Sequence, residues 1–166
     1  MESLKADYMV IGGFALPSYG AVRATVDLDV AVRLETADEF ESFVDAASKA
    51  GFEPRVASFS NPVSVFADRK SGMEVEFWLR PDGIEWDEET LRRRRSTKVG
   101  LTRVLLVSPE DFVVSKLARP DRGVQDEKDV KSVLARLEGS LDMDYLERRA
   151  RRMGVSALLE AIAAPD

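Results

Sequence analysis

One stretch near the N-terminus, residues 10–30, constrains the fold of this chain more than any other. It reads VIGGFALPSYGAVRATVDLDV, so a glycine pair ends an apolar run, and two aspartates one position apart follow after thirteen residues. Glycines after a buried strand let backbone N–H groups approach a phosphate, because no side chain blocks the path. The stretch therefore predicts a tight turn between a buried strand and a second strand that carries carboxylates.

The two aspartates, Asp27 and Asp29, lie in an alternating segment that we interpret as a strand with one apolar face. Residues two apart on a strand point to the same side, and a divalent cation relieves the repulsion between such carboxylates. A further alternating segment, MEVEFWL at 73–79, places Glu74 and Glu76 on one face. From the residues alone, a solvated strand face stays open beside a metal site built from these carboxylates.

The absence of histidine and cysteine narrows the chemistry that this chain can perform. It excludes nucleophilic systems that need a histidine base, disulfides, and zinc held by histidine or cysteine. Carboxylates, lysine, arginine, backbone amides and an oxygen-bound ion such as Mg²⁺ or Mn²⁺ remain. The net charge of −6 also argues against binding nucleic acid through the charge of the whole molecule.

Length and composition predict a single domain over residues 1–166, of the α/β (α+β) class, with 109–166 as a mainly helical C-terminal portion. No apolar run approaches the ~18 residues that a membrane span needs. The N-terminus lacks the basic and apolar regions of a signal peptide. We therefore expect a cytoplasmic protein without a membrane partner.

The spacing of apolar residues predicts the secondary structure. Strands are expected at 8–12, 27–34, 52–57, 62–67, 73–79 and 101–108. Helices are expected at 14–19, 36–49, 86–95, 109–119 and 124–137, with one or two more in 143–164. Thr36 and Ser108 are the expected N-caps of two of them. We assign the run from Arg92 to Arg95 to the C-terminal end of its helix rather than to an RNA-binding face.

Three other phosphate or metal motifs do not fit the sequence. A P-loop is absent, because no Gly-Lys-Ser/Thr occurs. An EF-hand fails because Ala31 stands where a third ligand belongs. A dinucleotide-binding oxidoreductase is disfavoured because Phe14 occupies the place of the second glycine.

The combination of Ile11-Gly12-Gly13 with Asp27-Leu28-Asp29-Val30 resembles the signature of the nucleotidyltransferase superfamily. In its fuller form it is most similar to the small AbiEii-type enzymes, toxins of abortive-infection and toxin–antitoxin systems. The matching positions are Gly12, Gly13, Ala15, Gly20, Arg23, Thr25, Asp27 and Asp29. A later segment, SPEDFVVSKLARPDRGVQDEKDV, resembles the same proteins at Lys116, Asp126 and Asp129.

The resemblance implies a mixed β-sheet flanked by helices, with an adenylyl-type transfer site. In such a site Gly12 and Gly13 hold the triphosphate, and Lys116 neutralises the leaving phosphates. Asp27 and Asp29 bind two magnesium ions. Glu76, where relatives usually have aspartate, deprotonates the attacking hydroxyl or completes the metal shell, and Glu74 stays open as the alternative. Arg23 and Thr25 orient the phosphate or the aspartate loop, or are ordinary polar loop residues.

We therefore expect a Mg²⁺-dependent nucleotidyltransferase that moves a nucleoside monophosphate from a triphosphate such as ATP to an acceptor hydroxyl. The acceptor classes left open are transfer RNA, a protein and a small molecule, and the resemblance adds an antitoxin as a partner. The alternative is a non-catalytic relative that keeps the fold as a binding or antitoxin-like protein. We expect Asp126 and Asp129 to cap and pair locally, and Trp78 to be buried under a helix rather than to stack a base.

Overall fold

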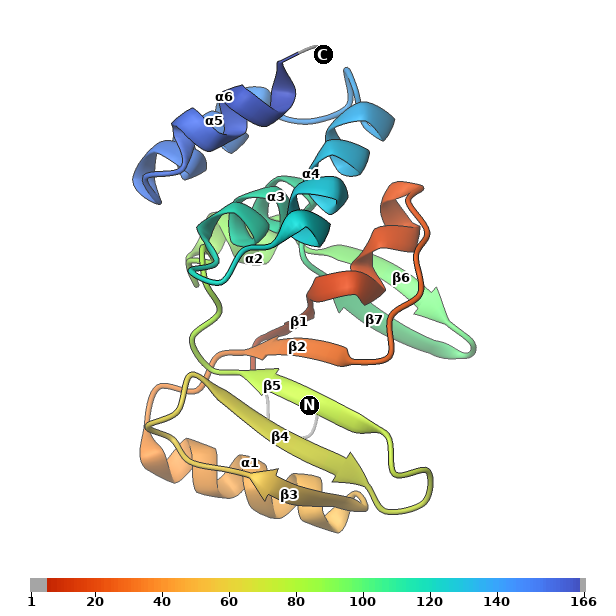
Figure 1. Cartoon of the computed structure of the whole chain (residues 1–166). Helices are drawn as coiled ribbons and strands as arrows, with labels where there is room; N and C mark the ends of the chain where they lie inside the picture. The colour runs from red at the N-terminus through yellow and green to blue at the C-terminus, as the bar shows by residue number, and fades with distance from the viewer. Residues whose placement is uncertain (1–5, 165–166) are drawn as a thin grey trace.

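The computed structural model describes residues 6–164, which form a seven-stranded mixed sheet with helices on both faces (Figure 1). The strands are β1 (Tyr8–Val10), β2 (Leu28–Val32), β3 (Phe52–Val56), β4 (Val63–Asp68), β5 (Glu74–Trp78), β6 (Arg95–Val99) and β7 (Thr102–Leu106). Their order in the sheet is β3-β4-β5-β2-β1-β7-β6. The expected mixed sheet flanked by helices is confirmed. The N-terminal stretch that we searched for a signal peptide lies partly outside the described residues.

The helices of the described part divide between the two faces of the sheet. They are the 3₁₀ helix η2 (Gly12–Tyr19), α1 (Ala37–Lys49), α2 (Glu88–Arg93), α3 (Pro109–Ala118), α4 (Val124–Arg136), α5 (Met143–Arg152) and α6 (Ser156–Ala163). In Figure 1, α1 covers one face, and the helices from α3 onward stand on the opposite side of the sheet. The chain from residue 109 to 163 is thus helical apart from its connecting loops.

Two apolar cores hold these layers together. On the α1 side, the ring of Phe43 packs edge to face against Phe66 and Phe77, at centroid distances of 5.7 and 4.9 Å. On the other side, strand residues such as Ala31 join the buried residues of α3 and α4 in one cluster. Ala31, which by alternation shares the face of Asp27 and Asp29, is fully buried because the C-terminal helices cover that face.

The pairing of the central strands sets which polar residues meet. β2 and β5 are parallel, and their register places Asp29 opposite Glu76. β1 runs antiparallel to β2, and the N–H of Ile11, just after β1, donates to the carbonyl of Asp29 at 2.9 Å. The glycine turn that follows β1 is thereby fixed beside the start of β2.

Local signals account for most helix boundaries. Thr36 Oγ1 accepts from Glu39 N at 3.2 Å, and Ser108 Oγ accepts from Asp111 N at 3.0 Å, so both expected N-caps are confirmed. The first helix begins at Gly12 rather than at residue 14, and it is a 3₁₀ helix.

The helix predicted over 86–95 was too long. It spans only Glu88–Arg93, and the arginine run is divided, because Arg94 turns the chain and Arg95 begins β6. The strand β6 was not predicted. Its sequence, RSTKV, has no alternation of apolar residues, since it is an edge strand that pairs with β7 alone.

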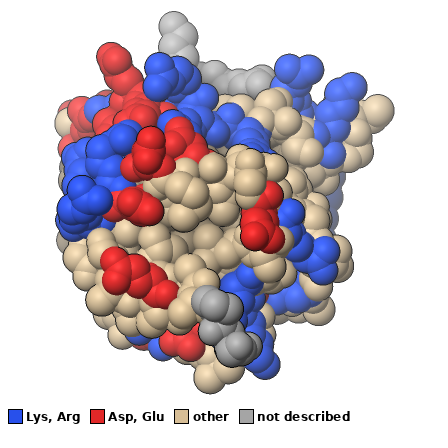
Figure 2. All heavy atoms as spheres, turned by 90° about the horizontal axis from the view of Figure 1, so that it is seen from above, with Lys and Arg blue, Asp and Glu red and all other residues tan. Residues whose placement is uncertain are grey.

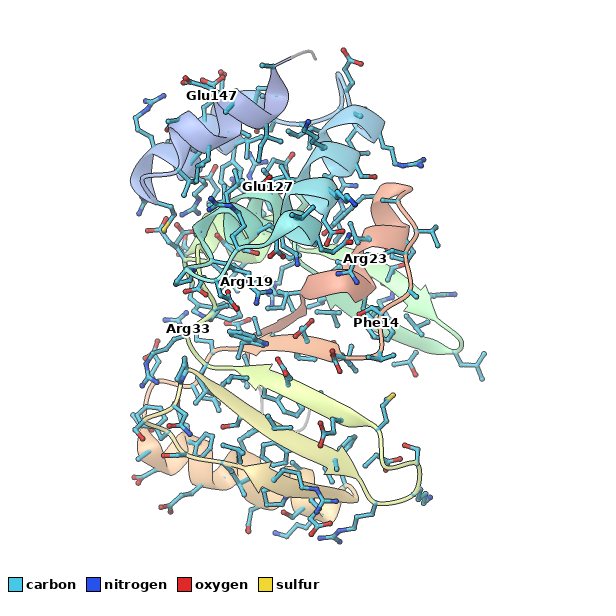
Figure 3. All side chains as sticks on the ribbon, viewed as in Figure 1. Phe14, Arg23, Arg33, Arg119, Glu127 and Glu147 are labelled. Atoms are coloured by element: carbon cyan, nitrogen blue, oxygen red, sulfur yellow. The ribbon has the colours of Figure 1, made fainter. Side chains whose placement is uncertain are left out.

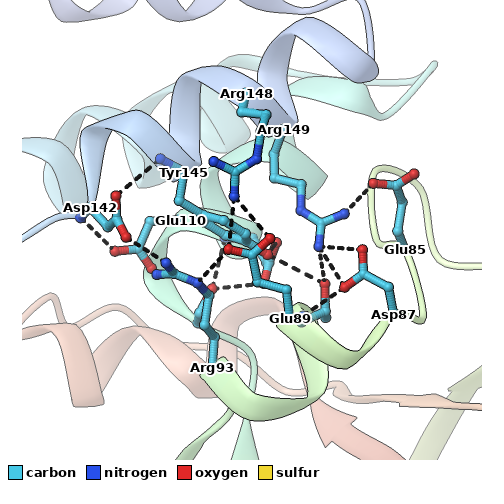
Figure 4. A network of polar contacts seen from close by, with 12 residues as sticks. Glu85, Asp87, Glu89, Arg93, Glu110, Asp142, Tyr145, Arg148 and Arg149 are labelled. Carbon is cyan, nitrogen blue, oxygen red and sulfur yellow. Dashed lines mark hydrogen bonds and ion pairs between the residues drawn. The ribbon is translucent and has the colours of Figure 1, made fainter.

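A buried arginine ties the helical portion to the sheet side of the molecule (Figure 4). The side chain of Arg149 on α5 is 2% exposed and donates to Asp87 at 2.7 Å and Thr90 at 2.9 Å, and it also contacts Glu85. Its partners belong to the loop and helix that follow β5. Through these contacts α5 is fixed against α2, which positions the helices that stand over the acidic face of β2 and β5.

Within residues 6–164, every helix is too short or too polar to cross a lipid bilayer.

Candidate functional site

The glycine pair is fitted against the segment that carries the aspartates. Gly12 has φ +64°, and a Cβ on it would lie 2.0 Å from Asp29 Oδ2. A Cβ on Gly13 would lie 2.9 Å from Thr25 Oγ1 and 3.0 Å from Arg23 Nη2. A side chain at either position would force these neighbouring side chains to move, and at Gly12 the positive φ would add backbone strain. Residues 12–13 and 23–29, predicted as two ends of one site, are in direct contact.

Asp29 is the best-defined carboxylate of the site. It is partly buried, and its Oδ1 accepts a hydrogen bond from Trp78 Nε1 at 3.2 Å. Burial raises the pKa of Asp29 above its usual value, although the bonds from Trp78 and Glu76 and the charge of Lys116 act in the opposite direction. The carboxylate is thus held in place by the indole on one side and by the glycine turn on the other.

Glu76 is the second carboxylate of the site, directly across the parallel strand pair from Asp29. Burial raises its pKa, and the negative charge of Asp29 raises it further. Glu74 lies on the same face of β5 but is exposed. The structure therefore brings Glu76, rather than Glu74, next to Asp29.

Asp27 does not join these two as closely as the motif suggests. It lies one residue before β2 and is exposed, although its charge is near enough to raise the pKa of Glu76 and of Asp29. Within the described range, no group of three aspartate or glutamate residues is drawn together as a metal cage. The predicted trio is therefore present as a close pair with a third carboxylate at its margin.

Asp29, but not Glu76, lines a small pocket between the sheet and the end of α3. The residues that line it are Ile11, Gly12, Asp29, Trp78, Pro81, Asp82, Ser115, Lys116 and Arg119. Its volume of about 50 Å³ accommodates an ion or a water molecule. Two cations from one helix end thus face the carboxylate and the glycine turn across a narrow space.

Lys116 reaches this pocket, but its charge is already paired. Its Nζ lies 2.7 Å from Asp126 Oδ1 and 3.6 Å from Asp129 Oδ2, and its side chain is 7% exposed. Asp126 also accepts from the N–H of Gly123 at 3.1 Å, so it caps α4 as expected. Asp129 does not pair only locally, because it also binds Arg23, 106 residues away, at 3.1 Å.

The donor set fits one divalent cation. Asp29 and Glu76 offer adjacent carboxylates with raised pKa values, and a bound cation would favour their charged forms. Carboxylate oxygens are the ligands that Mg²⁺ and Mn²⁺ prefer. The second ion of a two-metal clamp would depend on Asp27, which is exposed.

Sequence reasoning did not assign a role to two residues of the pocket. Trp78 was expected to be buried; it packs against the core under the helices, but its N–H also binds Asp29. Its position two residues after Glu76 was the signal, because both side chains must share a face. Arg119 follows Lys116 by three residues, a spacing that places both cations on one side of a helix end. Figure 3 shows Arg119 and Arg23 between the sheet and the helices.

Comparison with known protein families gives a match over most of the chain. Residues 1–156 match the model of the family described as "Nucleotidyl transferase of unknown function (DUF2204)". A comparison with curated proteins found no match.

Three solved structures with a similar fold are each distant from this chain in sequence. The antibiotic-resistance factor ANT(2'')-Ia is 17% identical, with a TM-score of 0.57, and the match covers 96% of this chain and 89% of that one. An antigenic nucleotidyltransferase-like protein from Paracoccidioides brasiliensis is 22% identical, with a TM-score of 0.55, over 96% and 87% of the two chains. The lincosamide antibiotic adenylyltransferase LnuA, bound to lincomycin, is 13% identical, with a TM-score of 0.54, over 80% and 88%. At these identities the likeness concerns the fold.

Proposed function

The chain belongs to the family of nucleotidyl transferases of unknown function, and from that membership we propose that it transfers a nucleoside monophosphate from a nucleoside triphosphate to an acceptor hydroxyl. The acceptor oxygen forms a bond to the α-phosphorus, the bond from that phosphorus to the bridging oxygen breaks, and pyrophosphate leaves. The hydroxyl proton passes to a carboxylate of the site. We further propose that residues 1–166 act as one domain, since both buried clusters contain strand residues together with helix residues.

One observation carries this proposal: the carboxylate of Asp29 touches the glycine turn on one side and faces Glu76 on the other. A phosphate bound at the N–H groups of Gly12 and Gly13 would thus lie beside the two carboxylates. Lys116 and Arg119 line the same pocket, so positive charge stands close to where the leaving phosphates would lie. The phosphate end and the carboxylate end of the motif are one site.

We assign a separate role in the reaction to each polar residue of the site. Asp29 and Glu76, with Asp27 at the margin, would hold Mg²⁺ or Mn²⁺, which when bound supplies charge stabilisation to the phosphates. Glu76, beside Asp29, either completes that metal shell or takes the proton of the attacking hydroxyl at its carboxylate. Arg23 and Thr25 pack against Gly13 and hold the turn in shape.

Two classes of acceptor are proposed, each from a different resemblance. ANT(2'')-Ia is seen in complex with adenylyl-2"-tobramycin and LnuA with lincomycin, so a small-molecule acceptor is one proposal. The AbiEii-type resemblance supports the other, a toxin that modifies transfer RNA or a protein and is held by an antitoxin. Figure 2 shows acidic and basic side chains interspersed on the face seen from above, around an uncharged centre. That face therefore offers no continuous basic track for RNA.

A second candidate function is a non-catalytic nucleotidyltransferase-fold protein that binds a nucleotide or a partner chain. It is favoured by the exposed position of Asp27 and by the small volume of the pocket. The close pairing of Asp29 with Glu76 favours catalysis. Two adjacent carboxylates without a cation destabilise the folded state by repulsion, and a protein that only binds a partner has no use for such a pair.

The experiment is a transfer assay. Purified protein is incubated with Mg²⁺ and each α-labelled nucleoside triphosphate, first with an RNA pool, then with a cell-extract protein fraction, then with aminoglycosides and lincosamides. We expect label on one acceptor class and none with Asp29→Asn. Glu74→Gln is the matched control, because it removes an exposed carboxylate from the same face of β5. Equal label with Asp29→Asn, or none with the wild type, would contradict catalysis by this site.

Metal binding is tested separately from transfer. At a Mg²⁺ concentration of 100 times Kd, binding to the folded state alone raises the free energy of unfolding by about 2.7 kcal/mol. We expect this stabilisation in the wild type, a reduced one in Asp27→Asn, and none in Asp29→Asn or Glu76→Gln. Retained stabilisation in Asp29→Asn would place the ion elsewhere.

A further inference from the structure

The loop after α3 places a second cation, Arg119, in the wall of the pocket that holds Asp29 and Gly12. Arg119 is the residue at which α3 ends, and Pro120 follows it, so the chain turns there. The N–H of Arg122 donates to the carbonyl of Arg119 at 3.3 Å, which closes the turn. The guanidinium is therefore delivered to the pocket by a short loop rather than by the helix itself.

Lys116, the cation that the sequence motif points to, is committed elsewhere. Its ammonium group is almost fully buried and has Asp126 at 2.7 Å and Asp129 at 3.6 Å. Two carboxylates balance its one charge, and Asp129 is itself bound to Arg23. To give its charge to a phosphate, Lys116 would have to leave partners that are buried with it, which is costly.

Arg119 is paired in a different way. Its Nε and Nη2 bind the two oxygens of Asp121, each at 3.0 Å, and Asp126 lies further away at 3.8 Å. The side chain of Asp121 is 72% exposed and that of Arg119 33% exposed, so the pair stands at the surface. Surface ion pairs are weak, and each partner can return to water when the pair opens. Arg119 can therefore change its partner at little cost.

The chemistry of the pair favours such an exchange. A guanidinium binds carboxylate and phosphate in the same bidentate geometry, through two N–H donors. Asp121 therefore occupies the donors that a phosphate would use. The Asp121 hydrogen bond is the first cause of the raised pKa of Arg119, and the charge of Asp29 adds to it from across the pocket. Arg119 lines the pocket together with Gly12 and Asp29, so its guanidinium already stands where a phosphate bound at the glycine turn would meet it.

We propose that Arg119 binds the triphosphate by exchanging the carboxylate of Asp121 for phosphate oxygens. Lys116 is instead a positioning residue that holds α4 and Arg23 in place. This inference rests on the proposed function. Asp121 then acts as an internal competitor that keeps Arg119 oriented towards the pocket before the nucleotide arrives.

The test measures binding of α,β-methylene-ATP with Mg²⁺ by isothermal titration calorimetry, so that no transfer is needed. We expect Arg119→Gln to weaken binding about 10- to 100-fold, because the Asp121 pair that Arg119 gives up offsets part of the two charge-assisted hydrogen bonds to phosphate. Arg119→Lys keeps the charge but not the bidentate geometry, so we expect its affinity to lie between those of Arg119→Gln and the wild type. Asp121→Asn removes the competitor and tightens binding about 2- to 5-fold, the range of a surface pair. Lys128→Gln, an exposed cation on α4, is the control and leaves the affinity unchanged.

The outcomes separate the two proposals. Wild-type affinity in Arg119→Gln overturns the inference, and so does weaker binding in Asp121→Asn, because Asp121 would then be a support and not a competitor. If the affinities change as expected but the wild type labels no acceptor, the transfer function fails and the role of Arg119 stands. Thermal melts of each variant exclude unfolding as the cause, since both exchanged residues lie at the surface.

Discussion

Gly12 and Asp29, seventeen positions apart in the chain, occupy neighbouring space so closely that only a glycine fits. A Cβ at residue 12 would lie 2.0 Å from the carboxylate oxygen Oδ2 of Asp29, and φ at Gly12 is +64°. The glycine is thus required twice, by backbone conformation and by the approach of the carboxylate. This contact joins the two halves of the N-terminal motif.

Gly12→Ala should therefore lose both stability and activity. The positive φ alone costs about 1 to 2 kcal/mol for a residue with a Cβ. Gly72→Ala is the matched control, because Gly72 has φ +73° with open space around its Cβ position. We expect Gly12→Ala to lower the free energy of unfolding by more than Gly72→Ala, measured by urea denaturation, and to abolish transfer. Equal losses in the two variants would show that Asp29 does not press on this position.

Asp29→Asn should make the protein more stable at neutral pH while it removes activity. Burial raises the pKa of Asp29, so the folded state holds the proton more tightly than the unfolded state. Stability then falls as pH rises from the unfolded pKa to the folded pKa, and it stays lower above both. Asparagine has the same shape, still accepts the Trp78 hydrogen bond and carries no charge.

Urea denaturation in the absence of divalent ions at pH 7 and in mild acid measures this difference. We expect the gap between Asp29→Asn and the wild type to be present at pH 7 and to close in acid, where Asp29 is protonated. Glu74→Gln, an exposed neutralisation on the neighbouring strand, should show no comparable gain. A destabilised Asp29→Asn at pH 7 would mean that the charge of Asp29 is already balanced in the folded protein.

Much of this arrangement was predictable from the sequence, because it depends on local rules. The turn after β1 and the alternation of β2 and β5 follow from spacing, and so do the shared face of Asp27 with Asp29 and that of Glu74 with Glu76. The parallel pairing that sets Asp29 opposite Glu76 does not follow from spacing, since it depends on which strands become neighbours. Alternation alone leaves Glu74 and Glu76 equivalent.

The parts that were not predictable depend on tertiary contacts. Ala31 reads as part of a polar face, but the C-terminal helices bury it, and no local pattern encodes that covering. β6 has no periodic signal because it is an edge strand with one partner. Lys116 matches a motif position, but the carboxylates that hold it come from α4, and the pairing is visible only once the two helices are packed.

Trp78→Phe should impair the site without unfolding the protein. The indole N–H donates to Asp29 Oδ1 at 3.2 Å, and this bond lowers the pKa of Asp29. Hydrogen bonds to charged groups contribute about 1.5 to 3 kcal/mol, so we expect roughly 10- to 100-fold lower kcat/KM. The acid limb of the pH profile should also move to higher pH, because Asp29 then takes up its proton more readily.

Trp86→Phe is the control for this prediction. The Nε1 of Trp86 is buried and has no hydrogen-bond partner among residues 6–164, so its removal should leave activity and the pH profile unchanged. If Trp78→Phe lowered activity but left the acid limb in place, Trp78 would act by packing alone and not through Asp29.

Arg149→Met tests whether the contacts of α5 with α2, and with the loop before α2, are needed for the stability of the fold. Arg149 is 2% exposed at its side chain, and it holds Asp87 and Thr90 at hydrogen-bond distance. Breaking a buried pair by removing one partner typically costs about 3 to 5 kcal/mol. The lower end applies here, because Asp87 is 39% exposed and returns to water.

The pH dependence of the same variant identifies the partner. The Arg149 hydrogen bond is the first cause that lowers the pKa of Asp87 to about 2. A lowered pKa contributes stability that is complete above the unfolded value and is lost as pH falls through the folded value. Urea denaturation should therefore show a large gap between wild type and Arg149→Met at pH 7 that narrows as pH falls towards 2. Arg151→Met, an exposed change on the same helix, should have the free energy of unfolding of the wild type at every pH. A gap that did not change with pH would assign the stabilisation to packing of the arginine stem rather than to its charge.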